Sequence, residues 1–167
     1  MKLRYIILLL VIAFVGCKKD ETNPPEDFQT KASGNWAITK VSYYYADDNE
    51  ESLYSDEFTP NSSVTFSGDN SVAITDTNGV AKTYTYVAAT RYDRDAEIYY
   101  YETTVRDLFT NYFAGKNGSD GPYKVKFADN NTMLWNVEVS NPQYNVPGSS
   151  AAKPSHAGYF YITFKRK

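Results

Sequence analysis

From Gly34 to the C-terminus, the sequence is a succession of short stretches in which apolar and polar residues alternate. Residues 124–127 read Lys-Val-Lys-Phe, and residues 159–164 read Tyr-Phe-Tyr-Ile-Thr-Phe. A period of two is typical of strands that have one buried and one exposed face. The chain also holds 16 Tyr and 9 Phe, and aromatic residues favour strands. The sequence therefore predicts an all-β fold.

Turn signals divide this region into about eight strands. Ser67-Gly68-Asp69-Asn70, Asn78-Gly79 and Asp129-Asn130-Asn131 each separate two alternating stretches. Because such connections are short, strands that follow one another in the chain should be antiparallel neighbours. The predicted strands cover residues 36–45, 64–66, 72–74, 83–86, 96–103, 124–127, 133–139 and 160–164.

One segment has the period of a helix. Its apolar residues fall at helical spacing, Thr104 with Asp107 resembles a capping box, and Gly115 suits a C-terminal stop. The sequence predicts a single helix over residues 105–114, placed to cover one open end of a barrel. The apolar stripe consists of Val105, Leu108, Phe109, Tyr112 and Phe113.

Residues 1–16 have the pattern of a signal peptide. Lys2 and Arg4 precede the apolar run 5–15, which as a helix rises only about 16 Å, roughly half of a bilayer core. Residues 14–17 read Phe-Val-Gly-Cys and resemble the lipobox of bacterial lipoproteins. The resemblance implies cleavage before Cys17 and lipidation of its thiol with acyl chains such as palmitate. An uncleaved signal anchor is the alternative.

Cys17 is the only cysteine, so an intramolecular disulfide is impossible. Residues 17–33 contain Pro24-Pro25 and many polar side chains and are predicted to form a flexible tether. Lys19-Asp20-Glu21 resembles the export signal of surface lipoproteins in Bacteroidota-type bacteria. The resemblance implies a lipid anchor in the outer membrane and a domain, residues 34–167, exposed at the cell surface. A solvated tether and a periplasmic orientation stay open.

Gly34-Asn35-Trp36 opens the first strand and resembles the G-x-W signature of lipocalins. With residues 66–69, 127–135 and 159–167, it makes the chain similar to the lipocalin-like domains of bacterial lipoproteins. The resemblance implies a closed antiparallel up-and-down β-barrel, with Trp36 packed at the closed end in a structural role. A two-sheet β-sandwich is the alternative, because the helix lies between strands and the connection over 141–156 is long.

The sequence gives little support for catalysis or for nucleic-acid binding. His156 is the single histidine, which leaves no full serine triad or His-based metal site. The formal net charge is −3 and the basic residues are scattered, which argues against a nucleic-acid surface. Asp76-Thr77-Asn78-Gly79 matches only a fragment of a calcium loop. We expect no enzyme activity, no cofactor and no metal; the carboxylates weighed as catalytic pairs are Asp93, Asp95, Glu97 and Glu102.

Two functions fit this pattern. In the first, the barrel binds a small hydrophobic or amphipathic molecule in its mouth, beneath the helix. In the second, the interior is packed and an exposed face binds a glycan or a partner protein at the cell surface. Tyr44, Tyr99 and Tyr101 are candidates for that outer face, but a register slip of one residue inverts the assignment. The sequence therefore names no binding residue.

Overall fold

A computed structural model of the chain describes residues 25–108 and 118–167. The elements in this part are α2 (Phe28–Ala32), β1 (Gly34–Ala46), β2 (Ser52–Phe58), β3 (Ser62–Phe66), β4 (Ser71–Thr75), β5 (Ala81–Asp93), β6 (Ile98–Val105), β7 (Tyr123–Asp129), β8 (Thr132–Ser140), β9 (Gln143–Tyr144), β10 (Lys153–Pro154) and β11 (Ala157–Arg166).

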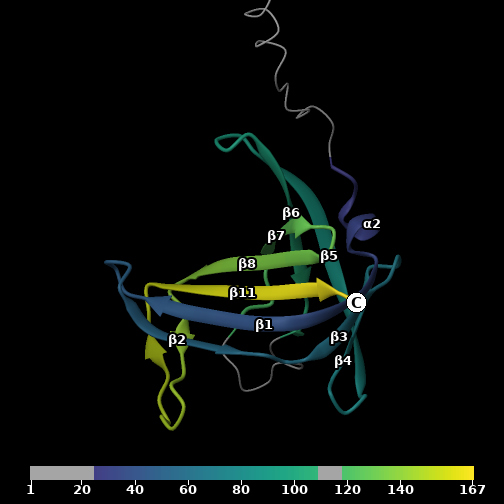
Figure 1. Ribbon diagram of the computed structural model, residues 1–167. Coiled ribbons are helices and arrows are strands. Elements are labelled where there is room, and N and C mark those ends of the chain that lie inside the picture. Colours follow the sequence, from purple (N-terminus) through teal and green to yellow (C-terminus); the bar gives the residue numbers. More distant parts are fainter. Residues whose placement is uncertain (1–24, 109–117) are drawn as a thin grey trace, which may run out of the picture.

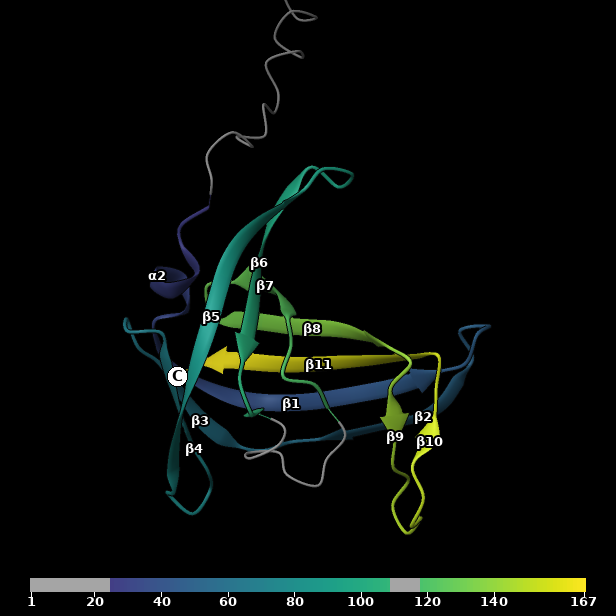
Figure 2. The ribbon, with the colours of Figure 1, turned by 180° about the vertical axis from the view of Figure 1, so that it is seen from behind.

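The sheet closes on itself. Strands β1, β3, β4, β5, β6, β7, β8 and β11 pair in this order, and β11 then pairs with β1. Every pairing is antiparallel, and the closing one runs from Trp36 opposite Arg166 to Ala46 opposite Ala157 (Figures 1 and 2). The prediction of an eight-stranded antiparallel barrel is confirmed. The sandwich alternative is wrong, because the first and last strands hydrogen-bond along nearly their whole length.

Strand β1 changes its inward face part-way along. Trp36 and Ile38 point into the barrel, and after a register shift between Ile38 and Lys40 the odd-numbered residues Val41 and Tyr43 do so. Such a bulge bends a strand and increases its twist. The first half of β1 pairs with β3 and the second half with β2, a strand that the sequence pattern did not predict.

Helix α2 closes one end of the barrel. Asp27 caps it by accepting the N–H of Thr30 at 3.0 Å. Phe28 is buried and lies within 6.5 Å, between ring centroids, of five aromatic side chains. The prediction of a flexible tether is therefore wrong for residues 28–33, which belong to the folded domain.

Trp36 lies beneath this helix, in the structural position that the lipocalin resemblance implies. Its Nε1 donates to the carbonyl of Ala32 at 2.7 Å. The guanidinium of Arg166 lies 4.2 Å from the centre of the indole ring and donates to the carbonyls of Ser33 and Lys31. This one side chain ties the last strand, the first strand and α2 together.

The barrel interior is filled largely by aromatic side chains. They come from the inward rows of the strands and from Phe28. The largest of the fully buried aromatic side chains include Trp36, Tyr45, Tyr86, Tyr123, Trp135 and Phe160.

Two predictions concern the longer connections. Val105 ends β6 and Arg106-Asp107 form a turn, while residues 109–117, most of the predicted helix, lie outside the described residues. The irregular stretch 141–156 contains the hairpin of β9 and β10, in which Tyr144 stacks on Tyr45 with ring centroids 4.8 Å apart. The hairpin thus packs against the barrel.

The segments that carry the export prediction lie outside the described residues: the signal peptide 1–16, Cys17, and Lys19 to Glu21. Within residues 25–108 and 118–167, no helix has the length and apolar character that a membrane crossing requires.

The hairpin of β5 and β6 projects beyond the barrel (Figures 1 and 2). Residues 81–85 of β5 pair with β4, and residues 86–93 pair with β6. In contrast, β6 pairs with β7 only over residues 101–103. The outer part of the hairpin, residues 91–100, therefore has no neighbouring strand on the β7 side. We call residues 91–100 the arm.

Candidate functional site

A cleft opens where β6 and β7 separate. Their register pairs end at Tyr101 opposite Val125, and beyond this point each strand has one free edge. The cleft has a volume of about 460 Å³. It is lined by Pro25, Lys31, Asp93, Ile98, Tyr99, Tyr100, Tyr101, Lys124, Val125, Lys126, Phe127 and Asn136.

The inner wall of the cleft is apolar and aromatic. Tyr101 is buried, and its ring packs edge-on against Phe127 with centroids 5.7 Å apart. The hydroxyl of Tyr101 donates to the carbonyl of Glu26 at 2.5 Å. Burial, helped by the nearby Glu26 and Asp27 carboxylates, raises the pKa of Tyr101. The phenol therefore stays neutral at physiological pH and adds no negative charge to the cleft.

The outer wall carries three ammonium groups, from Lys31, Lys124 and Lys126. The Lys31 Nζ lies 5.1 Å from the centre of the Phe127 ring, and the Lys124 Nζ lies 5.3 Å from that of Tyr100. Among the described residues, none of the three forms an ion pair with a carboxylate. The cleft is therefore a cationic rim around an aromatic floor.

Glu102 explains why Lys124 stays unpaired. The two residues are opposite each other in the β6–β7 register, but the Glu102 carboxylate accepts from the Arg91 guanidinium at 3.0 Å. Asp93 is the one carboxylate on the lining, and its Oδ1 accepts the N–H groups of Asp95 and Ala96 in the arm turn. Both acids are therefore engaged elsewhere.

Two polar groups are buried next to the cleft residues. Thr103 follows Tyr101 on the inward row of β6, and Trp135 is opposite Val125 in the β7–β8 register. Thr103 is 0% exposed and Trp135 is 2% exposed. Within the described part of the chain, neither Thr103 Oγ1 nor Trp135 Nε1 has a hydrogen-bond partner. Buried polar groups without a hydrogen-bond partner are uncommon in folded proteins.

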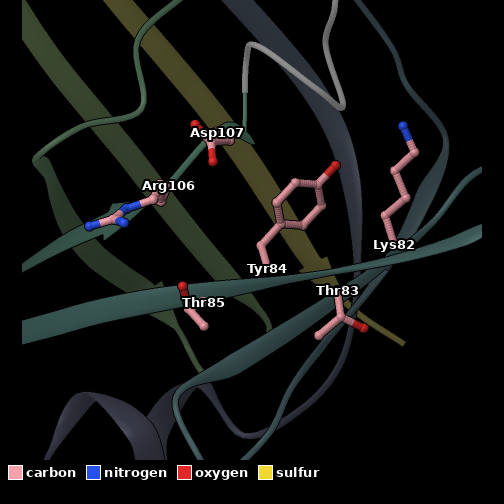
Figure 3. A pocket seen from close by; sticks show the side chains of 6 residues that line it. All are labelled: Lys82, Thr83, Tyr84, Thr85, Arg106 and Asp107. Atoms are coloured by element: carbon pink, nitrogen blue, oxygen red, sulfur yellow. The ribbon is translucent and has the colours of Figure 1, made fainter.

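A second hollow, of about 520 Å³, lies beside the start of β5 (Figure 3). Figure 3 shows the ring of Tyr84 rising from β5, with Arg106 and Asp107 on one side and Lys82 on the other. Its lining is polar and carries both signs of charge. Because the chain leaves the described range after Leu108, this hollow supports no ligand assignment.

The tyrosines predicted for the outer face divide into three cases. Tyr44 lies on the outer surface of β1, where it stacks on Tyr159 with centroids 4.5 Å apart. Tyr99 is exposed on the arm, as expected. The outward assignment of Tyr101 is wrong: it lies on the inward row of β6, and Tyr100 occupies the outer row.

The candidate residues for catalysis or metal binding lie in turns and on the surface. The Nδ1 of His156 is 3.1 Å from a carboxylate oxygen of Asp48, and both side chains are largely exposed. The carboxylate of Asp76 accepts the N–H groups of Asn78 and Val80, which holds the β4–β5 turn. Over residues 25–108 and 118–167, no group of three or more His, Cys, Asp or Glu side chains is placed to hold a metal ion.

Sequence reasoning missed the cleft. The alternating pattern of β7 predicts only that Lys124 and Lys126 lie on a polar outer face, which is correct but incomplete. The missing information is that β6 and β7 share three register pairs, a property of how two strands meet rather than of either sequence. The one available signal was the tyrosine run 99–101 ahead of a strand with alternating lysines.

No family model and no curated protein matches the sequence. A search of solved structures finds a structure of EF1p2_mFAP2b bound to DFHBI, with a TM-score of 0.31 and 10% sequence identity. The match covers 83% of this chain and 95% of that chain. A similarity at this level carries no argument, so the site has to be interpreted from its own geometry.

Proposed function

We propose that this chain is a lipid-anchored cell-envelope protein that binds a small anionic amphipathic molecule in the cleft between β6 and β7. The observation that carries the proposal is the combination of an aromatic floor, made by the buried Tyr101 and the partly buried Phe127, with ammonium groups at its rim that form no ion pair among the described residues. An apolar chain gains about 25 cal/mol for each Å² that it buries there. A carboxylate or phosphate head group would lie against the lysines.

The size and polarity of the cleft support a small ligand. A volume of about 460 Å³ falls within the range typical of small-molecule sites, which are mostly apolar with a few placed polar groups. The central interior is less suitable, because large side chains such as Trp36, Tyr86 and Phe160 fill it. The ligand therefore enters through the barrel wall. The sequence had suggested the mouth beneath residues 105–114.

The lipocalin-like barrel and the lipobox-like Cys17 together support a binding protein held at a membrane. Pro25 lines the cleft, and it is eight positions after Cys17 in the sequence. An extended chain of that length spans at most about 28 Å. A lipidated Cys17 would therefore keep the cleft near the outer-membrane surface, within reach of amphipathic molecules. In this proposal the protein binds and presents its ligand and performs no catalysis.

The test compares oleate with oleyl alcohol, which have the same chain and differ in head-group charge. Binding to the full chain in detergent micelles would be followed by quenching of Trp fluorescence and by native mass spectrometry. We expect oleate to bind more tightly, with an affinity that falls as salt is raised, because the rim lysines are partly exposed and salt screens them.

The variant Lys124→Gln/Lys126→Gln should weaken oleate binding about tenfold, since each exposed charge contributes roughly 0.5–1 kcal/mol. Oleyl alcohol binding should not change. Lys153→Gln is the matched control, because Lys153 is an exposed lysine on β10 that does not line the cleft. Equal affinity for the two probes, or equal loss in the control, would overturn the proposal.

A further inference from the structure

A second surface of the barrel has a separate chemistry, on the outer face of β2, β1 and β11. The register places two rows of outward side chains across these strands. In one row, Ser42 lies between Glu57 on β2 and Tyr161 on β11. In the next row, Tyr44 lies between Ser55 and Tyr159. Large side chains therefore surround the small Ser42.

Because serine is small, the face is hollowed above Ser42. The hollow has a volume of about 450 Å³, and its lining includes Ser42, Tyr44, Ser55, Glu57 and Tyr161. This set comes from all three strands, so the hollow is a property of the outer face and is separate from the cleft. The two sites share no lining residue.

The tyrosines form a rigid wall on one side of this hollow. The ring of Tyr44 is nearly parallel to those of Tyr159 and Tyr161, with interplanar angles of 17° and 13°. Tyr161 is still 39% exposed. Since its ring is held by its neighbour, little side-chain entropy is lost when a ligand packs against it.

The opposite wall offers hydrogen-bonding groups. The Glu57 carboxylate is paired with the Lys40 ammonium at 2.5 Å, and both side chains stay largely exposed. The Ser42 and Ser55 hydroxyls lie on the same outer face. Carboxylates accept strong hydrogen bonds from hydroxyl groups, and serine hydroxyls both donate and accept. The negatively charged Glu57 and Asp56 on the lining disfavour an anionic ligand.

We propose that this hollow is a binding site for a neutral glycan. The apolar C–H face of a pyranose ring packs on the exposed ring of Tyr161, whose π face attracts the partial positive charge of those hydrogens. The sugar hydroxyls on the other side donate to the Glu57 carboxylate and to the serine oxygens. This inference is independent of the amphipathic ligand proposed for the cleft.

The test titrates four neutral hexasaccharides into the full chain in detergent micelles: cellohexaose, maltohexaose, laminarihexaose and mannohexaose. Calorimetry would measure each affinity. We expect at least one to bind, and Tyr161→Ala to weaken that binding about tenfold. Glu57→Gln keeps the shape of the side chain and should weaken it by a smaller factor. Tyr92→Ala, which removes an exposed tyrosine on the arm, is the control and should bind normally.

Urea unfolding of each variant would establish that it is folded. If no hexasaccharide binds at millimolar concentration, or if Tyr161→Ala binds as tightly as the unaltered chain, the proposal is overturned. The proposal is also overturned if a protein partner binds to this face and none of the saccharides does. The oleate measurement on the same samples separates failure of this site from failure of the cleft.

Discussion

Replacing Thr103 by valine removes a hydroxyl group that is fully buried and, within the described residues, lacks a hydrogen-bond partner. Valine has nearly the same shape, so the packing around β6 is kept. A buried hydroxyl without a partner costs about 1–3 kcal/mol in stability. Valine avoids this loss and suits a strand slightly better. The free energy of unfolding should therefore rise.

The expected increase is about 1 kcal/mol, the lower end of that range, because the unfolded chain is partly compact. For a domain of this size, that corresponds to a rise in Tm of about 3 °C. Urea unfolding followed by Trp fluorescence would measure both the midpoint and the slope. The slope should not change, since the surface exposed on unfolding is the same.

Thr132→Val is the matched control. Thr132 is also buried on a strand, but its hydroxyl donates to the Asp129 carboxylate at 3.0 Å and accepts from Lys165 Nζ at 2.6 Å. Removing this hydroxyl should lower the free energy of unfolding by about 1 kcal/mol. The two substitutions are chemically identical and should act in opposite directions. If Thr103→Val destabilises the protein as much as Thr132→Val, the Thr103 hydroxyl has a partner and the reasoning fails.

Two further results are expected. Phe28→Ala should lower the free energy of unfolding by about 3 kcal/mol, because the ring is buried among aromatic side chains; an unchanged urea midpoint would mean that α2 is not part of the core. Hydrogen bonds from the Thr30 side chain to Asp27, and from the Asn131 backbone to Asp129, lower the pKa of both carboxyls. The ionised carboxylates therefore stabilise the folded protein above about pH 4, and this stabilisation is lost as pH falls through the lowered pKa values. The urea midpoint of the unaltered protein should fall in acid. The midpoint of Asp129→Asn should fall less over the same pH range.

The strand faces were predictable where apolar and charged residues alternate. Val125 is buried, and Lys124 and Lys126 are exposed, as the pattern indicated. On β8, Met133 and Trp135 face inward as expected. In these strands one register buries charge and the other does not, so the choice is energetically clear.

The pattern failed where the residue type is ambiguous or the element is short. Residues 99–101 are three consecutive tyrosines, and tyrosine suits either face, so the inward position of Tyr101 could not be read from alternation. Helix α2 has five residues, too few for a period of 3.6 to be recognised. Phe28 and Ala32, four residues apart, were the only trace of its buried face.

The closure of the barrel by β1 and β11 has a consequence for the order of assembly. Trp36 pairs with Arg166, so the contact that completes the ring joins residues from opposite ends of the chain. Until the last strand is available, β1 and β8 both present unpaired backbone groups, which invite association with other chains. Contacts of such long sequence separation also form slowly. During folding, the chain therefore passes through a stage in which two strand edges are open to association, and this stage ends when β11 pairs with β1 and β8.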